Sequence, residues 1–362
     1  MPKTRVLVVD DAVVIRKIIS ETVNRDPGLE VVGLASNGKI ALQKIPQVNP
    51  DIVILDVEMP EMNGLETIRE LRKTYAKLPV IMFSTLTGKG TVTTIEALTA
   101  GASDYVCKPA NVGNVTESIQ RLESELIPKI KHLCPGAVVP APPRLPKAAA
   151  YLPSQRTDGL QPVEILAVGT STGGPNALAE MFKGFARDFP VPIVVVQHMP
   201  PMFTALLAER LSASTPVKFV EGQAGMPVLP GQGYIAPGGK HMVIVRFNGK
   251  PVLQLNEEPP ENSCRPAVDV LFRSVVAAYG AGTLGVILTG MGYDGLRGCQ
   301  LIRERQGQII AQDRESSVVW GMPGAVAEAG LADTVVPLSQ VCTEIHRRVK
   351  LRRPPMPGGL TH

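Results

Sequence analysis

The chain begins its first regular pattern with Arg5-Val6-Leu7-Val8-Val9-Asp10-Asp11, a continuous apolar run that ends in two carboxylates. A run without polar alternation predicts a strand that is buried on both faces, as in a parallel sheet covered by helices. Four similar runs follow, and segments of helical length separate them. The five expected strands are Arg5–Val9, Leu29–Ala35, Asp51–Leu55, Pro79–Phe83 and Asp104–Val106. This alternation predicts an α/β domain over residues 1–133, with a doubly wound, five-stranded parallel sheet of the flavodoxin type.

A second α/β pattern starts at Val163 and extends to residue 352. Its expected strands lie near Glu164–Val168, Ile193–Gln197, Gly285–Thr289, Gln308–Ala311 and Thr334–Val336. One interruption differs from this pattern, because Asn248-Gly249 separates two apolar runs and is typical of a tight antiparallel hairpin. The second domain is therefore expected to be a mainly parallel α/β sheet with an added antiparallel hairpin.

The segment between the two patterns, residues 134–162, is rich in Pro and Ala and has no periodicity. Such a composition predicts an extended linker. The last residues, 353–362, read as a tail. A chain of 362 residues is long enough for two hydrophobic cores, which agrees with this division.

Composition excludes several classes of protein. Hydrophobic residues make up 44% and charged residues 19% of the chain, as in ordinary globular proteins. The net charge of +4 is not concentrated in a basic run, and a single Trp offers little for base stacking, so no nucleic-acid partner is expected. Five scattered Cys residues without a C-x-x-C pair favour reduced thiols in the cytoplasm. No signal peptide and no apolar run of membrane-spanning length is present, so no membrane insertion is expected.

Polar residues follow the expected strands of the first domain. Asp10 and Asp11 follow the first strand, Asp56 the third, Ser84 the fourth and Lys108 the fifth. The carboxyl ends of parallel strands meet at one edge, where three carboxylates would repel one another without a hard cation. Mg²⁺ binds such oxygen ligands, and an Asp beside it can attack a phosphoryl donor. Each residue alone could be a helix cap or a solvated charge, but the whole set favours a phosphorylation site.

A candidate nucleophile opens the second domain. The segment Gly169-Thr170-Ser171-Thr172-Gly173 follows the expected strand and precedes Pro175, a residue typical of the first helical position. It matches G-x-S-x-G, in which the glycines permit a sharp turn that exposes the serine. Backbone N–H groups at the start of the helix, including that of Thr172, could stabilise an oxyanion. A turn that merely caps the helix is the alternative.

A serine nucleophile needs a base and a carboxylate that orients it. His198 follows the apolar strand Ile193–Gln197 directly and is the first choice, with His241 second. Asp294 follows a later strand and is the preferred carboxylate, although it could instead cap the helix expected from Gly295. Asp269 and Asp313 are the rival carboxylates. The order Ser, His, Asp differs from the order Ser, Asp, His of the α/β-hydrolases, so a different scaffold is expected.

Two other interpretations remain open at this point. Gly290 to Gly295 forms a G-x-G-x-x-G after a strand, with Asp313 at a distance that suits a ribose contact. A nucleotide-binding regulator is therefore possible, although this fingerprint usually opens the first βαβ unit of its domain. The second alternative is a non-enzymatic adaptor, in which the first domain controls protein contacts.

The first 130 residues or so resemble the receiver domain of bacterial response regulators. The matching segments are VVDD ending at Asp11, LDVEMPEMNG from Leu55, FST at the fourth strand end and KP at Lys108. The resemblance implies that Asp56 accepts a phosphoryl group from a histidine kinase. It also implies a Mg²⁺ site completed by Asp10, Asp11 and the backbone carbonyl of Glu58, with Ser84, Tyr105 and Lys108 at the positions that respond to the phosphoryl group.

The second domain resembles the chemotaxis-type protein-glutamate methylesterases. The similar segments are GTSTGGP, VVQHMPPMFTALLAERL, YIAPGGKHM, CRPAVDVLF, LTGMGYDG and GMPGAV. The resemblance implies that Ser171 is the nucleophile, His198 the base and Asp294 its orienting carboxylate, with the Met291 amide as an oxyanion donor and no cofactor in this domain. Thr170 departs from the family, which usually has Ala there.

The same resemblance implies the substrate and its control. Members hydrolyse glutamate γ-methyl esters on the cytoplasmic helices of chemoreceptors, and many also deamidate receptor glutamines. The receiver domain is expected to cover the active site until Asp56 is phosphorylated.

Overall fold

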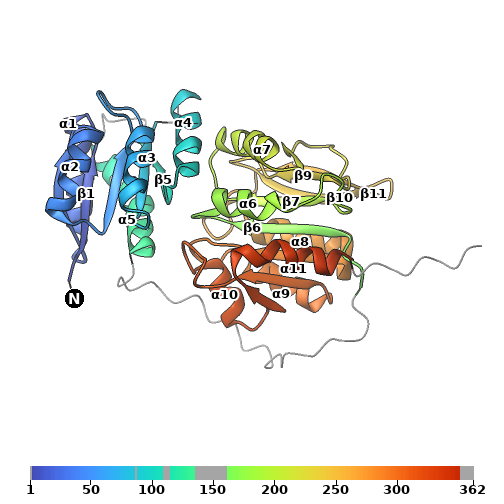
Figure 1. Cartoon of the computed structure of the whole chain (residues 1–362). Coiled ribbons are helices and arrows are strands. Elements are labelled where there is room, and N and C mark those ends of the chain that lie inside the picture. Colours follow the sequence, from blue (N-terminus) through green and yellow to red (C-terminus); the bar gives the residue numbers. More distant parts are fainter. Residues whose placement is uncertain (1, 86–87, 109–114, 135–160, 351–362) are drawn as a thin grey trace, which may run out of the picture. The chain divides into compact units, whose positions relative to one another are not determined.

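The computed structural model describes residues 2–85, 88–108, 115–134 and 161–350. The chain forms two compact units, Met1–Ala141 and Pro142–His362, which are treated separately below (Figure 1). The predicted linker lies outside the described residues except at its two ends, and the predicted tail lies entirely outside them.

The first unit contains one parallel sheet with the strand order β2-β1-β3-β4-β5. Helices α1 and α5 pack together on one face, and α2, α3 and α4 form a contiguous layer on the other. The strands are β1 (Thr4–Val9), β2 (Leu29–Ala35), β3 (Ile52–Asp56), β4 (Val80–Ser84) and β5 (Asp104–Cys107). The helices are α1 (Val13–Arg25), α2 (Gly38–Val48), α3 (Gly64–Thr74), α4 (Gly88–Thr99) and α5 (Val115–Leu133). The predicted flavodoxin-type sheet is confirmed, because this strand order is that of the flavodoxin type and every strand lies within one residue of its expected bounds.

The second unit contains a seven-stranded parallel sheet with the order β14-β13-β12-β6-β7-β9-β8. Its strands are β6 (Ile165–Thr170), β7 (Ile193–Gln197), β8 (Lys218–Glu221), β9 (Gln232–Ile235), β12 (Thr283–Ile287), β13 (Gln308–Gln312) and β14 (Thr334–Val336). Its helices are α6 (Gly174–Lys183), α7 (Phe203–Ser214), α8 (Val268–Tyr279), α9 (Leu296–Glu304), α10 (Met322–Glu328) and α11 (Leu338–Lys350), with a short 3-10 turn η1 (Gly280–Gly282). Helices α6, α7 and α11 form one layer, and α8, α9 and α10 form the other.

The predicted hairpin forms a separate two-stranded sheet of β10 (His241–Phe247) and β11 (Lys250–Asn256), packed against α8. Its turn residues Asn248 and Gly249 both have positive φ, at 49° and 77°. This is the conformation that a two-residue type I′ turn requires, and Asn-Gly provides it with little strain. The fold class predicted for the second domain is therefore confirmed.

The order of the strands determines where a ligand can bind. The sheet starts at β6, continues on one side through β7, and is extended on the other side by β12 and β13. Helices that leave adjacent strands in opposite directions open a crevice at the carboxyl ends of those strands. In the second unit this switch point lies between β6 and β12, next to β7.

A large hydrophobic core supports this edge of the sheet. All six residues of β6 are buried, and so are all five of β7 and all five of β12. Side chains of α8 and α9 pack over them, including Leu271, Phe272 and Cys299. Because three fully buried strands meet here, the loops at their carboxyl ends start from a rigid base.

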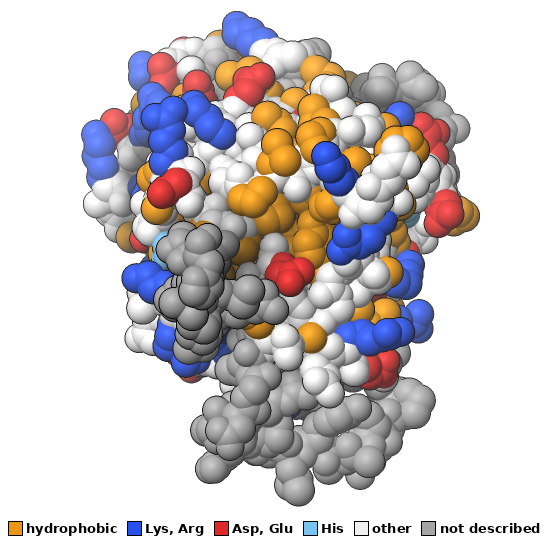
Figure 2. All heavy atoms as spheres, turned by 90° about the vertical axis from the view of Figure 1, so that its right-hand side faces the viewer, with side chains coloured by type: hydrophobic (Ala, Val, Ile, Leu, Met, Phe, Trp, Pro, Cys, Tyr) orange, Lys and Arg blue, Asp and Glu red, His pale blue; other side chains and the backbone are white. Residues whose placement is uncertain are grey.

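On the outside of the molecule, Figure 2 shows hydrophobic side chains gathering near the centre of one face, with Lys and Arg side chains mainly towards its margins. The most exposed large hydrophobic side chain of the hairpin is that of Phe247, which precedes the turn. In the part of the chain that the structure describes, no helix combines the length and the apolar content needed to cross a bilayer.

Candidate active site

Ser171 lies directly after β6, at the switch point of the sheet. Its backbone N–H donates to the carbonyl of Thr289 at 3.1 Å, and its carbonyl accepts from Gln197 Nε2 at 2.9 Å. The serine is therefore fixed between the strand ends of β12 and β7. Gly173 follows with φ of +79° and acts as the N-cap of α6, a conformation that favours glycine. The local sequence thus places a half-buried hydroxyl at the start of a helix.

His198 and Asp294 lie beside each other, although 96 residues separate them in sequence. The His198 Nε2 atom is 2.8 Å from Asp294 Oδ2, and the Asp294 side chain is only 2% exposed. Burial raises the pKa of Asp294, but hydrogen bonds from His198 and from two backbone N–H groups outweigh this effect, and the pKa is lowered. Because an ionised carboxylate only accepts hydrogen bonds, Nε2 carries a proton, so Nδ1 is the nitrogen with the free electron pair when the imidazole is neutral.

The Asp294 carboxylate caps α8 rather than the helix that follows it. It accepts hydrogen bonds from the N–H groups of Val268 at 2.6 Å and Asp269 at 3.1 Å, in the first turn of α8. Helix α9 begins after its N-cap Gly295, and Asp294 accepts from the N–H of Gly295 itself, at 3.0 Å, but within the described residues it accepts from no N–H group in the first turn of α9. The alternative of Asp294 as a cap for the following helix is therefore incorrect, and its carboxylate is instead held against the start of α8.

The other ring nitrogen of His198 faces a residue that the sequence did not suggest. His198 Nδ1 is 3.5 Å from the Sγ atom of Cys264. Among the described residues, Ser171 Oγ makes no hydrogen bond, including to His198. Hydrogen bonds between catalytic groups are often long in the absence of substrate and shorten in its complex, so this geometry is compatible with a Ser-His-Asp triad.

The two predicted oxyanion donors flank Ser171. In the described part of the chain, the Met291 N–H donates to no other group. Thr172 is buried at the start of α6, and its carbonyl accepts from Thr289 Oγ1 at 2.9 Å. A Cβ atom on Gly290 would lie 2.9 Å from the Cβ of Ser171. Glycine at this position therefore allows the loop after β12 to contact the serine closely.

The rival residues are occupied elsewhere. His241 lies in β10, where its ring nitrogens meet the Ala267 N–H and the Pro259 carbonyl, both at 3.2 Å. Asp313 accepts hydrogen bonds from the N–H and hydroxyl of Ser316 in its own turn. Within the described residues of this unit, neither His241 nor Asp313 makes a hydrogen bond or an ion pair with His198.

Asp269 does belong to the site, although not as a partner of the histidine. Its carboxylate accepts from the Gly298 N–H at 2.7 Å, in the first turn of α9. The Nδ2 atom of Asn262 donates to Asp269 at 2.9 Å and to Asp294 at 2.8 Å. Burial, and then the charge of Asp294, raise the pKa of Asp269 to about 6. Asn262 and Cys264 were missed because they come from a loop before α8, for which only the motif CRPAVDVLF gave a signal.

The first unit has a second group of candidate functional side chains at its own strand ends. Lys108 Nζ lies 2.8 Å from an oxygen of Asp10 and 2.8 Å from an oxygen of Asp56. Asp11 is exposed beside them, and one carboxylate oxygen from each Asp lies within 4.8 Å of the others. Burial raises the pKa of Asp56, and the hydrogen bond from Lys108 lowers it. The charge of Asp10 raises it further, so that the pKa of Asp56 is about 6. This set of oxygen donors fits a hard divalent cation, which would relieve the repulsion between the carboxylates.

The remaining predicted residues of this unit lie around that group. The Glu58 N–H is 3.4 Å from Asp56 Oδ1, which places the turn after β3 beside the carboxylate. Ser84 is buried and its hydroxyl accepts from Thr94 Oγ1 at 2.7 Å. Tyr105 in β5 is also buried, and its ring faces Lys129. No hydrogen bond joins the Ser84 hydroxyl to Asp56 in the described residues.

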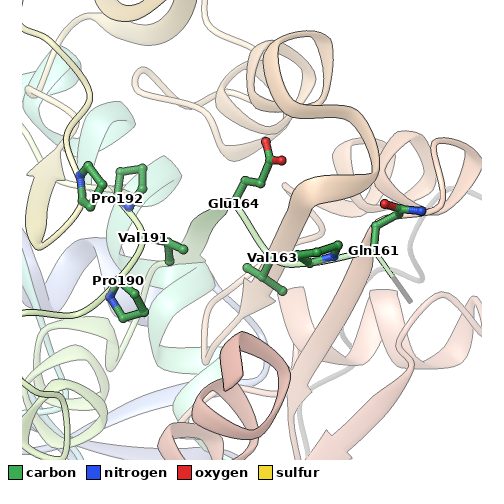
Figure 3. Close-up of a pocket in the computed structure, with 8 residues that line it drawn as sticks. Gln161, Val163, Glu164, Pro190, Val191 and Pro192 are labelled. Atoms are coloured by element: carbon green, nitrogen blue, oxygen red, sulfur yellow. The ribbon is translucent and has the colours of Figure 1, made fainter. Parts of the chain in front are cut away.

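A separate hollow lies at the opposite edge of the second sheet. Residues 161–164, residues 190–192 and Pro230 line it, and they precede β6, β7 and β9 (Figure 3). Four of these lining residues are prolines. The hollow is therefore at the amino ends of the strands, away from Ser171, and is not the candidate active site.

The two units together define a class: a two-domain signalling hydrolase, in which a receiver-type unit precedes an α/β unit with a candidate hydrolytic site. Comparisons with known proteins are more specific. Residues 166–345 match the family model for CheB methylesterase, and residues 6–120 match the response regulator receiver domain. The chain belongs to the family of receiver-containing CheB methylesterases, and it is a hydrolase.

Individual relatives agree with this assignment. A protein from Trichodesmium erythraeum named protein-glutamate methylesterase/protein-glutamine glutaminase is 51% identical over 351 residues, which cover 96% of this chain and 100% of the relative. A protein of the same name from a Nocardioides species is 50% identical over 99% of each chain. The crystal structure of the Thermotoga maritima CheB methylesterase catalytic domain is 41% identical, with a TM-score of 0.50, and covers 52% of this chain and 99% of that one. These findings fit the esterase interpretation and not the nucleotide-binding or adaptor alternative.

Proposed function

We propose that this protein removes methyl groups from glutamate γ-methyl esters on the cytoplasmic helices of chemoreceptors, and that it deamidates receptor glutamines at the same site. The names of the relatives support both reactions. One observation carries the assignment of residues: Ser171, His198 and Asp294 follow three adjacent strands, and His198 Nε2 is 2.8 Å from Asp294. A protein acting on these substrates works in the cytoplasm.

The proposed reaction is acyl transfer in two steps. Asp294 holds the Nε2 proton, so Nδ1 of His198 takes the proton of Ser171 as the hydroxyl oxygen attacks the ester carbonyl. The N–H groups of Met291 and Thr172 stabilise the negative oxygen of the tetrahedral intermediate. His198 returns the proton to the leaving methoxide, and methanol departs. Water then attacks the acyl-serine with His198 again as the base, which releases the glutamate carboxylate and restores the serine.

The receiver unit is proposed to control this activity through phosphorylation of Asp56 by a histidine kinase. Asp10, Asp11, Asp56 and the Glu58 carbonyl would hold Mg²⁺, which supplies positive charge to the phosphoryl oxygens when bound. Lys108 already lies between Asp10 and Asp56 and would pair with a phosphoryl oxygen. Ser84 and Tyr105 are the side chains proposed to respond.

The catalytic assignment is tested by methanol release from a methylated receptor fragment. Ser171→Ala and Asp294→Asn should each lower kcat by about 10⁴-fold, the usual effect of removing a triad member. Asp313→Asn is the matched control, because Asp313 serves only its own turn, and it should keep nearly normal turnover. Near-normal turnover in Ser171→Ala would reject the proposed mechanism.

The control by phosphorylation is tested separately. A small phosphodonor with Mg²⁺ should increase the activity of the unchanged protein but not that of Asp56→Asn. An equal increase in both proteins would reject Asp56 as the phosphorylation site while leaving the esterase assignment intact.

A further inference from the structure

The loop before α8 presents a thiol to the proposed catalytic histidine. Residues Glu261 to Cys264 form a tight turn, in which the N–H of each end residue donates to the carbonyl of the other, at 3.1 and 2.9 Å. The central residues Asn262 and Ser263 both have positive φ, at 52° and 62°. Non-glycine residues adopt this conformation only where the surrounding structure holds them in it. The position of Cys264 is therefore well defined.

The turn is fixed by hydrogen bonds to the site itself. The Asn262 side chain donates to both Asp269 and Asp294. Cys264 is partly exposed, and the imidazole of His198 is 12% exposed, so both can be reached from solvent. The sulfur is thus held beside the ring nitrogen that does not face Asp294.

The separation of these two atoms matches that of two ligands on one metal ion. Cys264 Sγ and His198 Nδ1 are 3.5 Å apart. Zinc binds thiolate sulfur at about 2.3 Å and imidazole nitrogen at about 2.0–2.1 Å, which at a tetrahedral angle places the ligand atoms about 3.5–3.6 Å apart. Cys264, His198 and Asp294 also offer ligand atoms that all lie within 4.8 Å of one another.

The role of Asp294 follows from its hydrogen bonds. Its oxygens already accept from His198, Asn262 and three backbone N–H groups, so it is not free to be a direct ligand. A carboxylate that holds the far N–H of a metal-binding imidazole is a common arrangement, because it fixes the tautomer and makes the other nitrogen a better ligand. Here that nitrogen is Nδ1, which faces the sulfur.

We propose that Cys264 Sγ and His198 Nδ1 bind one Zn²⁺ ion, with water in the remaining positions, and that this binding reversibly inhibits the enzyme. When the ion binds, Cys264 releases its thiol proton and His198 releases any proton on Nδ1, both to solvent, while the Nε2 proton stays hydrogen-bonded to Asp294. The ion is coordinated by Nδ1 of His198, the nitrogen that would otherwise accept the proton of Ser171. The inhibition, but not the binding, rests on the proposed function.

Binding is measured first, on the full-length protein with Co²⁺ as a spectroscopic substitute and excess Mg²⁺ to saturate the carboxylates of the receiver unit. Sulfur bonded to Co²⁺ gives a charge-transfer absorption in the near ultraviolet, which oxygen ligands do not produce. One equivalent of Co²⁺ should produce this band in the unchanged protein and not in Cys264→Ser, which keeps the size of the side chain. Cys342→Ala is the matched control and should retain the band, since Cys342 is the other partly exposed thiol and lies one turn before His346 on α11.

Inhibition is measured next, with each protein compared with its own rate in metal-free buffer. The Zn²⁺ concentration that halves activity should rise at least about tenfold in Cys264→Ser, and a chelator should restore the unchanged protein. Absence of the band in the unchanged protein, or an equal band in Cys264→Ser, would overturn the metal site. No hydrolysis in metal-free buffer would instead contradict the proposed function, and the cobalt spectrum would still decide whether the ion binds.

Discussion

Asp294 and Asp269 cap two neighbouring helices in a reciprocal way: Asp294 caps α8, which contains Asp269, and Asp269 caps α9, which follows Asp294. Asp294, which precedes α9, accepts from the Val268 and Asp269 N–H groups at the start of α8. Asp269, in α8, accepts from the Gly298 N–H at the start of α9. Because the N-terminus of a helix attracts negative charge, each carboxylate is stabilised by the partner helix. The carboxylate that orients His198 is therefore fixed by two helices rather than by one loop.

The first prediction concerns Asn262, which donates to both carboxylates at 2.9 and 2.8 Å. Asn262→Gly retains the positive φ without strain and removes the side-chain carboxamide together with its Cβ. Loss of a hydrogen bond to a charged group costs about 1.5–3 kcal/mol, so kcat/KM should fall at least about tenfold, with KM little changed. Steady-state methanol release measures both constants. Ser263→Ala changes an exposed residue of the same turn and should have little effect; equal losses in both variants would contradict a positioning role for Asn262.

The second prediction is the pH dependence of the reaction. Burial lowers the pKa of His198, but the neighbouring Cys264 sulfur and Asp294 raise it, and the balance is a pKa of about 10. Only the neutral imidazole can take the serine proton. The value of kcat/KM in metal-free buffer should therefore still be rising with pH at about pH 9, well above the usual range for histidine.

The variant Cys264→Ser measures how much the Cys264 sulfur contributes to the raised pKa of His198. Serine removes the effect of the sulfur that raises the pKa of His198, so this pKa should fall and the rise in kcat/KM should be complete at lower pH. Activity at neutral pH, relative to the plateau, should increase. The profile is measured with the rate of uncatalysed ester hydrolysis subtracted. Superimposable profiles for the two proteins would show that Cys264 does not influence the base.

The third prediction concerns the close contact between the loop after β12 and Ser171, the proposed nucleophile. A Cβ on Gly290 would lie 2.4 Å from Met322 Sδ and 2.9 Å from Ser171 Cβ. Gly290→Ala must therefore displace the serine or the loop that carries Met291. A displacement of about 1 Å costs about 100-fold in rate, and kcat should fall by that order.

The control for Gly290→Ala is Gly292→Ala in the same loop. A Cβ on Gly292 meets no atom within 4 Å, although its φ of +80° makes the substitution somewhat strained. It should lower stability slightly and affect kcat much less. A loss of kcat as large as that of Gly290→Ala would show that strain in the loop, and not contact with Ser171, is responsible.

Much of this architecture follows from the sequence because parallel strands have a simple signature. Buried strands without alternation are easily recognised, and their carboxyl ends must meet at one edge, so Ser171, His198 and Asp294 could be predicted as neighbours. Short strands at or next to the edge of the sheet are harder to predict. Strand β8 has only four residues and exposes Lys218 and Val220, and β9 begins in a Gly-rich segment. Neither stood out as an apolar run.

The finer parts of the site depend on where helices start in space, which local patterns do not encode. The sequence left a cap of the next helix as the alternative role of Asp294, whereas its carboxylate accepts from the Val268 and Asp269 N–H groups at the start of α8. Cys264 and Asn262 follow no strand, so the rule that gathered the other residues did not apply to them. Their positions depend on a turn with two positive φ angles, Asn262 and Ser263, that lacks glycine.

The last prediction concerns stability, and it involves an ion cluster that holds α11 against the sheet. Glu344 accepts from Arg347 at 2.7 and 2.8 Å and from Arg348 at 2.8 Å, and the Arg348 side chain is only 4% exposed. The hydrogen bond from Arg347 is the largest effect and lowers the pKa of Glu344, whereas burial raises it. The balance is a pKa of about 2. A lowered pKa stabilises the fold above the unfolded value of 4.5, and this contribution is lost as the pH falls towards 2.

Glu344→Gln should therefore destabilise the second unit by about 1–3 kcal/mol at neutral pH, and the difference from the unchanged protein should narrow as the pH falls from 4.5 towards 2. Urea unfolding followed by fluorescence of Trp320 isolates this unit, because Trp320 is the single Trp of the chain. Glu180→Gln removes an exposed pair with Lys183 and should change stability by less than about 0.5 kcal/mol. If the difference in the free energy of unfolding between Glu344→Gln and the unchanged protein stays constant down to pH 2, the ionisation of Glu344 does not stabilise α11. Only the shape of the side chain would then matter.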